Sequence, residues 1–124
     1  SAGGICWFEY GHSDSMSFYN PKTWKYIRVK GLGLLKGNHC PHFNGETKGV
    51  KRKEDFLKFM RKYSETGIAI DNHCAIEFVD NKYRVISNKK GRKAFRVINN
   101  KGKVSVEEIK QKKQFSPVPH LHKK

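Results

Sequence analysis

The sequence opens on a serine between small residues, in the order Ser1-Ala2-Gly3. This order matches the second half of a Gly-x-Ser-x-Gly nucleophile elbow, in which a strand turns sharply into a helix and exposes the serine oxygen. A serine attacks at neutral pH only when a base lies within hydrogen-bond reach and a further group orients that base. The chemistry that Ser1 predicts is therefore acyl transfer, and the rest of the chain has to supply a base and an orienting group.

Histidines and an aspartate later in the chain can fill these two roles. His39 and His42 lie in a polar stretch with many turn-forming residues, and Asp71 directly follows a short apolar run, residues 67–70. Sites in open α/β sheets form at the carboxyl ends of strands, where Asp71 would lie. The resulting order of serine, histidine and acid differs from the serine, acid, histidine order of the α/β-hydrolases.

Two other chemistries fit the same residues less well. The α-amine of Ser1, with a pKa of about 7.7–8.0, could act as its own base, but the folds that do this need many long strands and this sequence predicts few. His39, Cys40, His42, His73 and Cys74 could bind zinc, but their spacing does not match the usual ligand pairs. We expect no metal and no cofactor, and we expect Cys40 and Cys74 to be small buried residues.

The spacing of apolar residues predicts the elements that would position these groups. Residues 1–8 are expected to start a buried helix that includes Trp7 and Phe8, residues 9–19 and 37–45 to be loops, and residues 52–63 to form an amphipathic helix. Strands are expected at 25–29, 31–35 and 67–70, with hairpins at 74–79/82–86 and 93–98/104–106. From Glu107 onward, polar residues with Pro117 and Pro119 predict an irregular end. This order indicates the second half of an α/β domain with added β-hairpins.

Composition restricts the class of protein further. The formal net charge is +15, and 20 of the 26 Lys and Arg residues follow residue 50. A basic module that binds nucleic acid or another polyanion is the alternative function, but no nucleic-acid motif accompanies the charge, so we interpret it as a solvated surface. No secretory signal and no apolar run of about 20 residues is present, which predicts a cytoplasmic protein without a membrane contact.

Several segments together resemble the peptidase E (aspartyl dipeptidase) family of serine peptidases, from Ser1 to about Val85. The segments are Ser1-Ala2-Gly3, Gly11-His12-Ser13-Asp14-Ser15, Leu32-Gly33-Leu34-Leu35, Cys40-Pro41-His42-Phe43 and Gly67-Ile68-Ala69-Ile70-Asp71. The resemblance implies the C-terminal portion of a doubly wound, flavodoxin-like (class I glutamine amidotransferase-like) three-layer α/β sheet. It implies one incomplete domain over residues 1–124, with the catalytic part at 1–86 and a β-hairpin and basic tail at 87–124.

The resemblance also implies roles for the catalytic residues. Ser1 matches the nucleophile and His42 the general base. The third position is a carboxylate at the end of the strand 67–70, for which Asp71 is the nearest match, and an alignment shifted by one residue stays open. The backbone N–H of Ala2 would be one oxyanion-hole donor.

Two further matches concern the substrate pocket. Asp14 matches an aspartate that organises the pocket, and Arg52 matches an arginine that would bind an aspartate side chain of the substrate, the alternative being a solvated charge run from Lys51 to Lys53. The implied reaction is hydrolysis of dipeptides with an N-terminal aspartate through an acyl-serine. The other oxyanion donor and several central strands would belong to a missing N-terminal half. We therefore expect residues 1–124 alone to be inactive, with that half as the expected partner.

Overall fold

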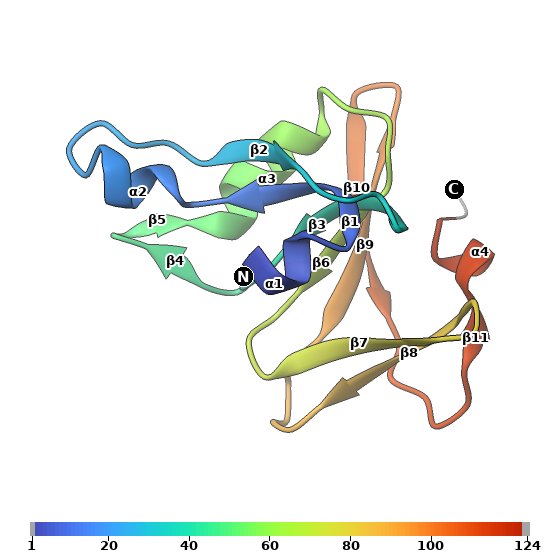
Figure 1. The fold of residues 1–124 in the computed structure, drawn as a ribbon. Coiled ribbons are helices and arrows are strands. Elements are labelled where there is room, and N and C mark those ends of the chain that lie inside the picture. Colours follow the sequence, from blue (N-terminus) through green and yellow to red (C-terminus); the bar gives the residue numbers. More distant parts are fainter. Residues whose placement is uncertain (1, 123–124) are drawn as a thin grey trace.

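The structure is a computed structural model that describes residues 2–122 (Figure 1). Its main sheet has six strands in the order β10-β9-β6-β3-β1-β2, and a smaller sheet has the order β11-β8-β7. The strands of these two sheets are β1 (Phe8–Ser13), β2 (Ile27–Lys30), β3 (Leu35–Cys40), β6 (Gly67–Ile70), β7 (Cys74–Val79), β8 (Lys82–Ser87), β9 (Ala94–Asn100), β10 (Lys103–Ile109) and β11 (Ser116–Pro117). The helices are α1 (Ala2–Ile5), α2 (Met16–Tyr19), α3 (Arg52–Met60) and α4 (Val118–Leu121), and β4 (Glu46–Thr47) pairs with β5 (Val50–Lys51) in a short ribbon.

The centre of the main sheet is parallel. β3 pairs in parallel with β1 on one side and with β6 on the other, and antiparallel strands extend the sheet outward at both ends. The carboxyl ends of β3 and β6 therefore lie at the same edge of the sheet, with Cys40 opposite Ala69 in the register. The segments that follow these two ends carry His42 and Asp71.

Two apolar clusters cover the opposite faces of this sheet. Neighbouring residues of a strand point to opposite faces, and on β6 Ile68 joins one cluster while Ala69 joins the other. Phe56 and Met60 of α3 pack with Ala69, whereas the hairpin of β7 and β8 packs on the Ile68 side. The molecule thus has three layers, with α3, the main sheet and the β7–β8 hairpin in that order.

The short helix α1 lies on the same face of the sheet as the hairpin. Its one buried residue, Ile5, packs over Gly11 of β1. A Cβ at Gly11 would lie 2.2 Å from Cγ2 of Ile5, so a larger residue there would push α1 away from the sheet. Glycine at this position lets the segment that follows Ser1 pack closely on the strand.

The structure confirms the α/β class, the strand 67–70, the helix starting at residue 52 and both hairpins. The helix ends at Met60, three residues before the predicted end. Cys40 is fully buried as expected, and burial raises the pKa of its thiol, while Cys74 is only half-buried.

Four predictions about the elements were wrong. Residues 9–13 belong to β1 instead of a loop, and the strand predicted at 31–35 is β3, which extends from Leu35 through the predicted loop to Cys40. The initial helix ends at Ile5, so that Trp7 is 51% exposed while Phe8 is buried in β1. The C-terminal end contains regular elements after residue 115, because Pro117 pairs with β8 and Pro119 lies in the first turn of α4, where a missing N–H costs nothing.

None of the helices in residues 2–122 combines the length and the apolar composition that crossing a membrane requires.

Candidate active site

His42 lies in a tight turn directly after β3. Its φ is +50°, a left-handed backbone conformation that residues other than glycine rarely adopt. The turn is fixed to the end of β6, because the N–H of Phe43 donates to the Ile70 carbonyl oxygen at 2.9 Å and Asn44 Oδ1 accepts from the N–H of Asn72 at 2.8 Å. The surrounding structure thus holds His42 in a strained conformation, a feature that is concentrated at active sites.

The ring of His42 is oriented by Asn72. Nδ1 of His42 forms a hydrogen bond with Oδ1 of Asn72. Because a carboxamide oxygen only accepts, Nδ1 carries the hydrogen and Nε2 of the neutral ring is left with its lone pair. This is the tautomer that a general base needs, and both side chains remain accessible to solvent.

Asp71, the predicted third member of the site, is turned to a different partner. Its Oδ2 accepts a hydrogen bond from the backbone N–H of Lys93 at 3.0 Å, and its own N–H donates to the Lys93 carbonyl oxygen. Asp71 thereby ties the end of β6 to the start of β9. Nδ1 of His42 donates instead to Oδ1 of the next residue, Asn72, which corresponds to the one-residue shift that the sequence left open.

Ser1 lies outside the described residues, so the structure locates only the segment that follows it. Ala2 begins α1, and its carbonyl oxygen accepts from the N–H of Cys6 at 3.1 Å. Gly4 of this helix and His42 line the same cavity. The helix α1 and the oriented histidine therefore border the same cavity.

Asp14 and the buried Arg52 form an ion pair beside this site. Nη2 of Arg52 lies 3.2 Å from Oδ2 of Asp14, which also accepts a hydrogen bond from Oγ1 of Thr47 at 2.7 Å. Nη1 of Arg52 donates to the His12 carbonyl oxygen at 2.9 Å, and the guanidinium lies over the ring of Tyr26. Arg52 is 2% exposed, so its interpretation as part of a solvated charge run was wrong.

His12 occupies the core next to this pair instead of a loop. Its Nε2 lies 2.7 Å from Oδ2 of Asp55 on α3, and its ring stacks on Tyr26 with 4.5 Å between centroids. Burial lowers the pKa of His12 to about 4, against the opposing effect of the hydrogen bond to Asp55. His12 and Asp55 are 43 residues apart, so no local pattern in the sequence predicts that they pair.

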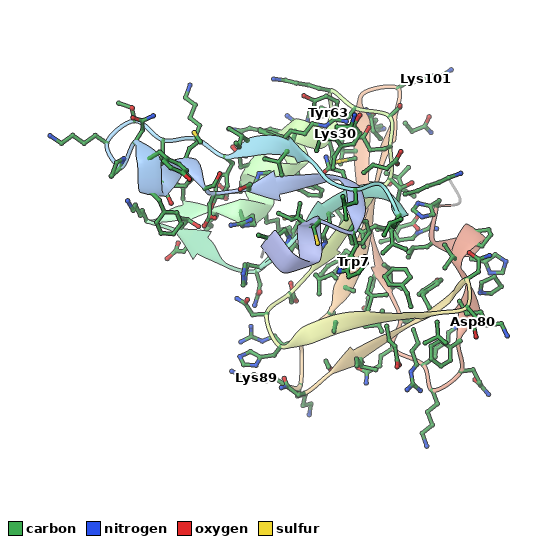
Figure 2. All side chains as sticks on the ribbon, viewed as in Figure 1. Trp7, Lys30, Tyr63, Asp80, Lys89 and Lys101 are labelled. Atoms are coloured by element: carbon green, nitrogen blue, oxygen red, sulfur yellow. The ribbon has the colours of Figure 1, made fainter. Side chains whose placement is uncertain are left out.

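The pair of His42 and Asn72 stands between two cavities of different character. A cavity of about 730 Å³ lies on one side, with Trp7, Phe8 and Phe78 among its mainly apolar lining. A cavity of about 250 Å³ lies on the other side, lined by Asp14, Glu46, Thr47 and Arg52. Both cavities include His42 and Asn72 in their walls, so the histidine is accessible from either one. Trp7 is labelled in Figure 2 beside α1, between the main sheet and the β7–β8 hairpin.

Metal ligands are not grouped in the part of the chain that the structure describes. Within residues 2–122, no three side chains among His, Cys, Asp and Glu come together in a way that could hold a metal ion.

A histidine held by a polar side chain at the carboxyl ends of parallel strands is typical of hydrolytic enzymes built on α/β sheets. The model of peptidase family S51 matches residues 1–86, and the chain belongs to this family. The match confirms the resemblance to peptidase E that the motifs predicted.

Two curated proteins are similar to the chain. The uncharacterized peptidase YgaJ of Bacillus subtilis (strain 168) is 37% identical over 99 residues, which cover 79% of this chain and 39% of YgaJ. A protein named G2/mitotic-specific cyclin-1, from Trypanosoma brucei brucei, is 31% identical over 123 residues, which cover 74% of this chain and 36% of that protein. The chain thus spans less than two fifths of the length of these curated relatives.

Proposed function

We propose that this chain carries the nucleophile and the base of a serine peptidase that hydrolyses dipeptides with an N-terminal aspartate. Ser1 is the nucleophile and His42 the general base, with Asn72 as the group that orients His42. The observation that carries this proposal is the position of His42, which is held in a strained turn with Nδ1 bound to Asn72 and Nε2 left to accept a proton. Membership in a peptidase family supports the reaction class.

The reaction follows from the tautomer of His42. Nε2 takes the hydroxyl proton of Ser1 while the serine oxygen attacks the peptide carbonyl carbon, and the N–H of Ala2 donates to the oxyanion that forms. The C–N bond then breaks, and His42 gives its proton to the leaving amine. Water attacks the acyl-serine in the second half, with His42 again as base, and releases the aspartate and the free serine.

Asn72 makes this site different from one with a carboxylate. A neutral carboxamide fixes the orientation and the tautomer of His42, but it supplies no negative charge to stabilise the imidazolium that forms during the reaction. We therefore propose that orientation, not charge, is what Asn72 contributes.

We place the aspartyl end of the substrate in the polar cavity beside His42. The guanidinium of Arg52 lines this cavity and is shared with Asp14, so a substrate carboxylate would join an existing ion pair instead of meeting a free cation. Asp14 in turn holds Thr47 of the β4–β5 ribbon. In this proposal Asp14 organises the wall of the pocket, and Arg52 provides its positive charge.

A further segment completes the enzyme in this proposal. The chain covers 39% of YgaJ, and the strand before the nucleophile and a second oxyanion donor would come from the part of the fold that precedes Ser1. We call the protein in which this chain is joined to that segment the completed protein. We place it in the cytoplasm, in agreement with the free thiols of Cys6, Cys40 and Cys74.

The test compares variants of the completed protein on aspartyl-p-nitroanilide and with a fluorophosphonate probe that labels reactive serines. We expect Ser1→Ala to abolish labelling, and His42→Ala to lower kcat by at least about a thousandfold. Ser13→Ala is a control for labelling at another serine. Labelling that persists in the Ser1→Ala variant would refute the assignment of the nucleophile.

A further inference from the structure

We propose that His39 is a positioning residue that holds the three segments of the site together and sets the distance between α1 and His42. This inference rests on the proposed function. His39 and His42 are the two histidines that the sequence offered as candidate bases, and the inference gives His39 a different role.

The first contact of His39 is with β6. His39 lies on β3, three residues before His42, and its Nδ1 lies 2.9 Å from the Ile68 carbonyl oxygen. Because that oxygen accepts, Nδ1 carries the hydrogen of the neutral ring. The bond joins the strand that leads to His42 with the strand that leads to Asn72, and it adds a side-chain contact to the backbone pairing of β3 with β6.

The second contact is with the segment that follows Ser1. Nε2 of His39 faces Gly4 of α1 so closely that a Cβ at Gly4 would lie 3.2 Å from it. At Gly3, one residue earlier, an added Cβ would meet nothing within 4 Å. The helix therefore rests on the imidazole at Gly4, and the absence of a side chain there allows this approach.

The remaining surroundings fix the ring and keep it uncharged. The ring stacks on Phe8 of β1, with 4.9 Å between centroids and 22° between planes, and His39 is 4% exposed. Burial lowers the pKa of His39 to about 4, so the ring is neutral at physiological pH. Because Nε2 of His39 is buried against Gly4, His39 does not replace His42 as the base, and its contribution is geometric.

The geometry matters because proton transfer requires a close approach of base and nucleophile. A displacement of about 1 Å can cost about a hundredfold in rate. One imidazole contacts the segment after Ser1 through Gly4 and the strand before Asn72 through Ile68, and it shares a strand with the turn of His42. Loss of the ring would let these three segments shift relative to one another.

The experiment uses three variants of the completed protein. His39→Leu removes both contacts, and His39→Asn keeps an amide hydrogen near the position of Nδ1 but removes the outer part of the ring under Gly4. Gly4→Ala adds a methyl group against an intact ring.

We expect His39→Leu and Gly4→Ala to lower kcat tenfold or more, with KM changed less than twofold and the pH–rate profile unchanged. The double variant Gly4→Ala/His39→Asn is expected to recover part of the rate lost in Gly4→Ala. His120→Asn, at an exposed histidine on α4, is the control.

A second readout does not depend on activity. Amide hydrogen exchange of Cys6, whose N–H closes the helical turn of α1, is measured in the 124-residue chain and in the completed protein. We expect faster exchange of Cys6 in His39→Leu, with exchange in α3 unchanged. Unchanged exchange at Cys6 together with unchanged kcat would overturn the inference. A loss of kcat would also overturn it if amide exchange rose throughout the protein and the double variant recovered no activity. If the completed protein has no peptidase activity, the proposed function fails, and the exchange of Cys6 still decides whether His39 positions α1.

Discussion

Among single residues, Asn72 and Asp71 are neighbours with different partners, and of the two only Asn72 is hydrogen-bonded to the His42 side chain. Asn72 forms the hydrogen bond to His42, while the carboxylate of Asp71 is held by the backbone of Lys93. A carboxylate at position 72 would stabilise the protonated ring, because an opposite charge within hydrogen-bond distance raises the pKa of a histidine. Substitutions at these two neighbouring positions therefore separate orientation from charge.

We predict that Asn72→Asp shifts the acidic limb of the kcat/KM profile to higher pH by about one unit, because the new charge raises the pKa of His42. Asn72→Ala is expected to lower kcat by about tenfold to a hundredfold without that shift, since the ring loses its orientation. Asp71→Asn keeps an acceptor for Lys93 and is expected to leave the profile in place. A profile that responds to Asp71→Asn and not to Asn72→Asp would restore Asp71 as the orienting residue.

At the scale of elements, the helix α3 is anchored to β1 by its first residue. Arg52 reaches the His12 carbonyl oxygen and the Asp14 carboxylate, and Asp55, three residues later, binds the ring of His12. The helix also packs Phe56 and Met60 into the core. The polar contacts at its start therefore fix its direction along the sheet, and with it the wall of the polar cavity.

We predict that Arg52→Met lowers the free energy of unfolding by about 1–3 kcal/mol, because it leaves the His12 carbonyl oxygen without its donor and the partly exposed Asp14 without its counter-charge. Arg52→Lys should not restore this stability, since a single ammonium does not reproduce the planar fork that meets two acceptors. Urea denaturation measures both effects. Lys58→Met, at an exposed position on the same helix, is the control, and an equal loss in that variant would contradict the prediction.

Elements with a local apolar pattern were predictable, and those whose polar residues are satisfied from a distance were not. Phe56 and Met60 recur at helical spacing, and residues 67–70 form a short apolar run, so α3 and β6 follow from the sequence. In contrast, β1 and β3 contain His12 and His39, whose burial depends on Asp55 and on the Ile68 carbonyl oxygen. These partners lie 43 and 29 residues away, and no local pattern reports them.

The candidate site shows the same division. The motif around His42 made it a candidate base, but the contact of His42 with Asn72 instead of Asp71 could not be predicted, because Asp71 is bound by Lys93, which lies at the end of β6 where β9 pairs with that strand. The burial of Arg52 likewise depends on β1 lying under α3. Such positions are fixed by the assembled sheet and cannot be read from residue spacing alone.

At the scale of the whole molecule, two buried histidines link stability to pH. Burial lowers the pKa of His12 and of His39 from 6.5 to about 4. Between these values the unfolded chain binds more protons than the folded one, so stability falls as the pH decreases from 6.5 to 4.

Each histidine contributes on the order of 3 kcal/mol to this fall, because one pKa unit corresponds to about 1.4 kcal/mol. We predict that urea denaturation gives a clearly lower free energy of unfolding at pH 5 than at pH 7. His39→Asn should reduce that difference, because it removes one of the two titrating groups. Equal stability at both pH values would show that these rings are not buried in neutral form.

The surface near the apolar cavity suggests where the rest of the fold binds. Trp7, Leu32 and Leu34 are 51%, 72% and 67% exposed, and the relatives are more than twice as long as the matched segments. Exposed apolar side chains of this size mark interaction surfaces. We therefore predict that, in a Trp24→Phe background, acrylamide quenches Trp7 fluorescence strongly in the 124-residue chain and weakly in the completed protein. Equal quenching in both forms would place the additional segment elsewhere.

The 124-residue chain alone is also expected to show no hydrolysis of aspartyl-p-nitroanilide. Full turnover by this chain would show that the site needs nothing more than these residues.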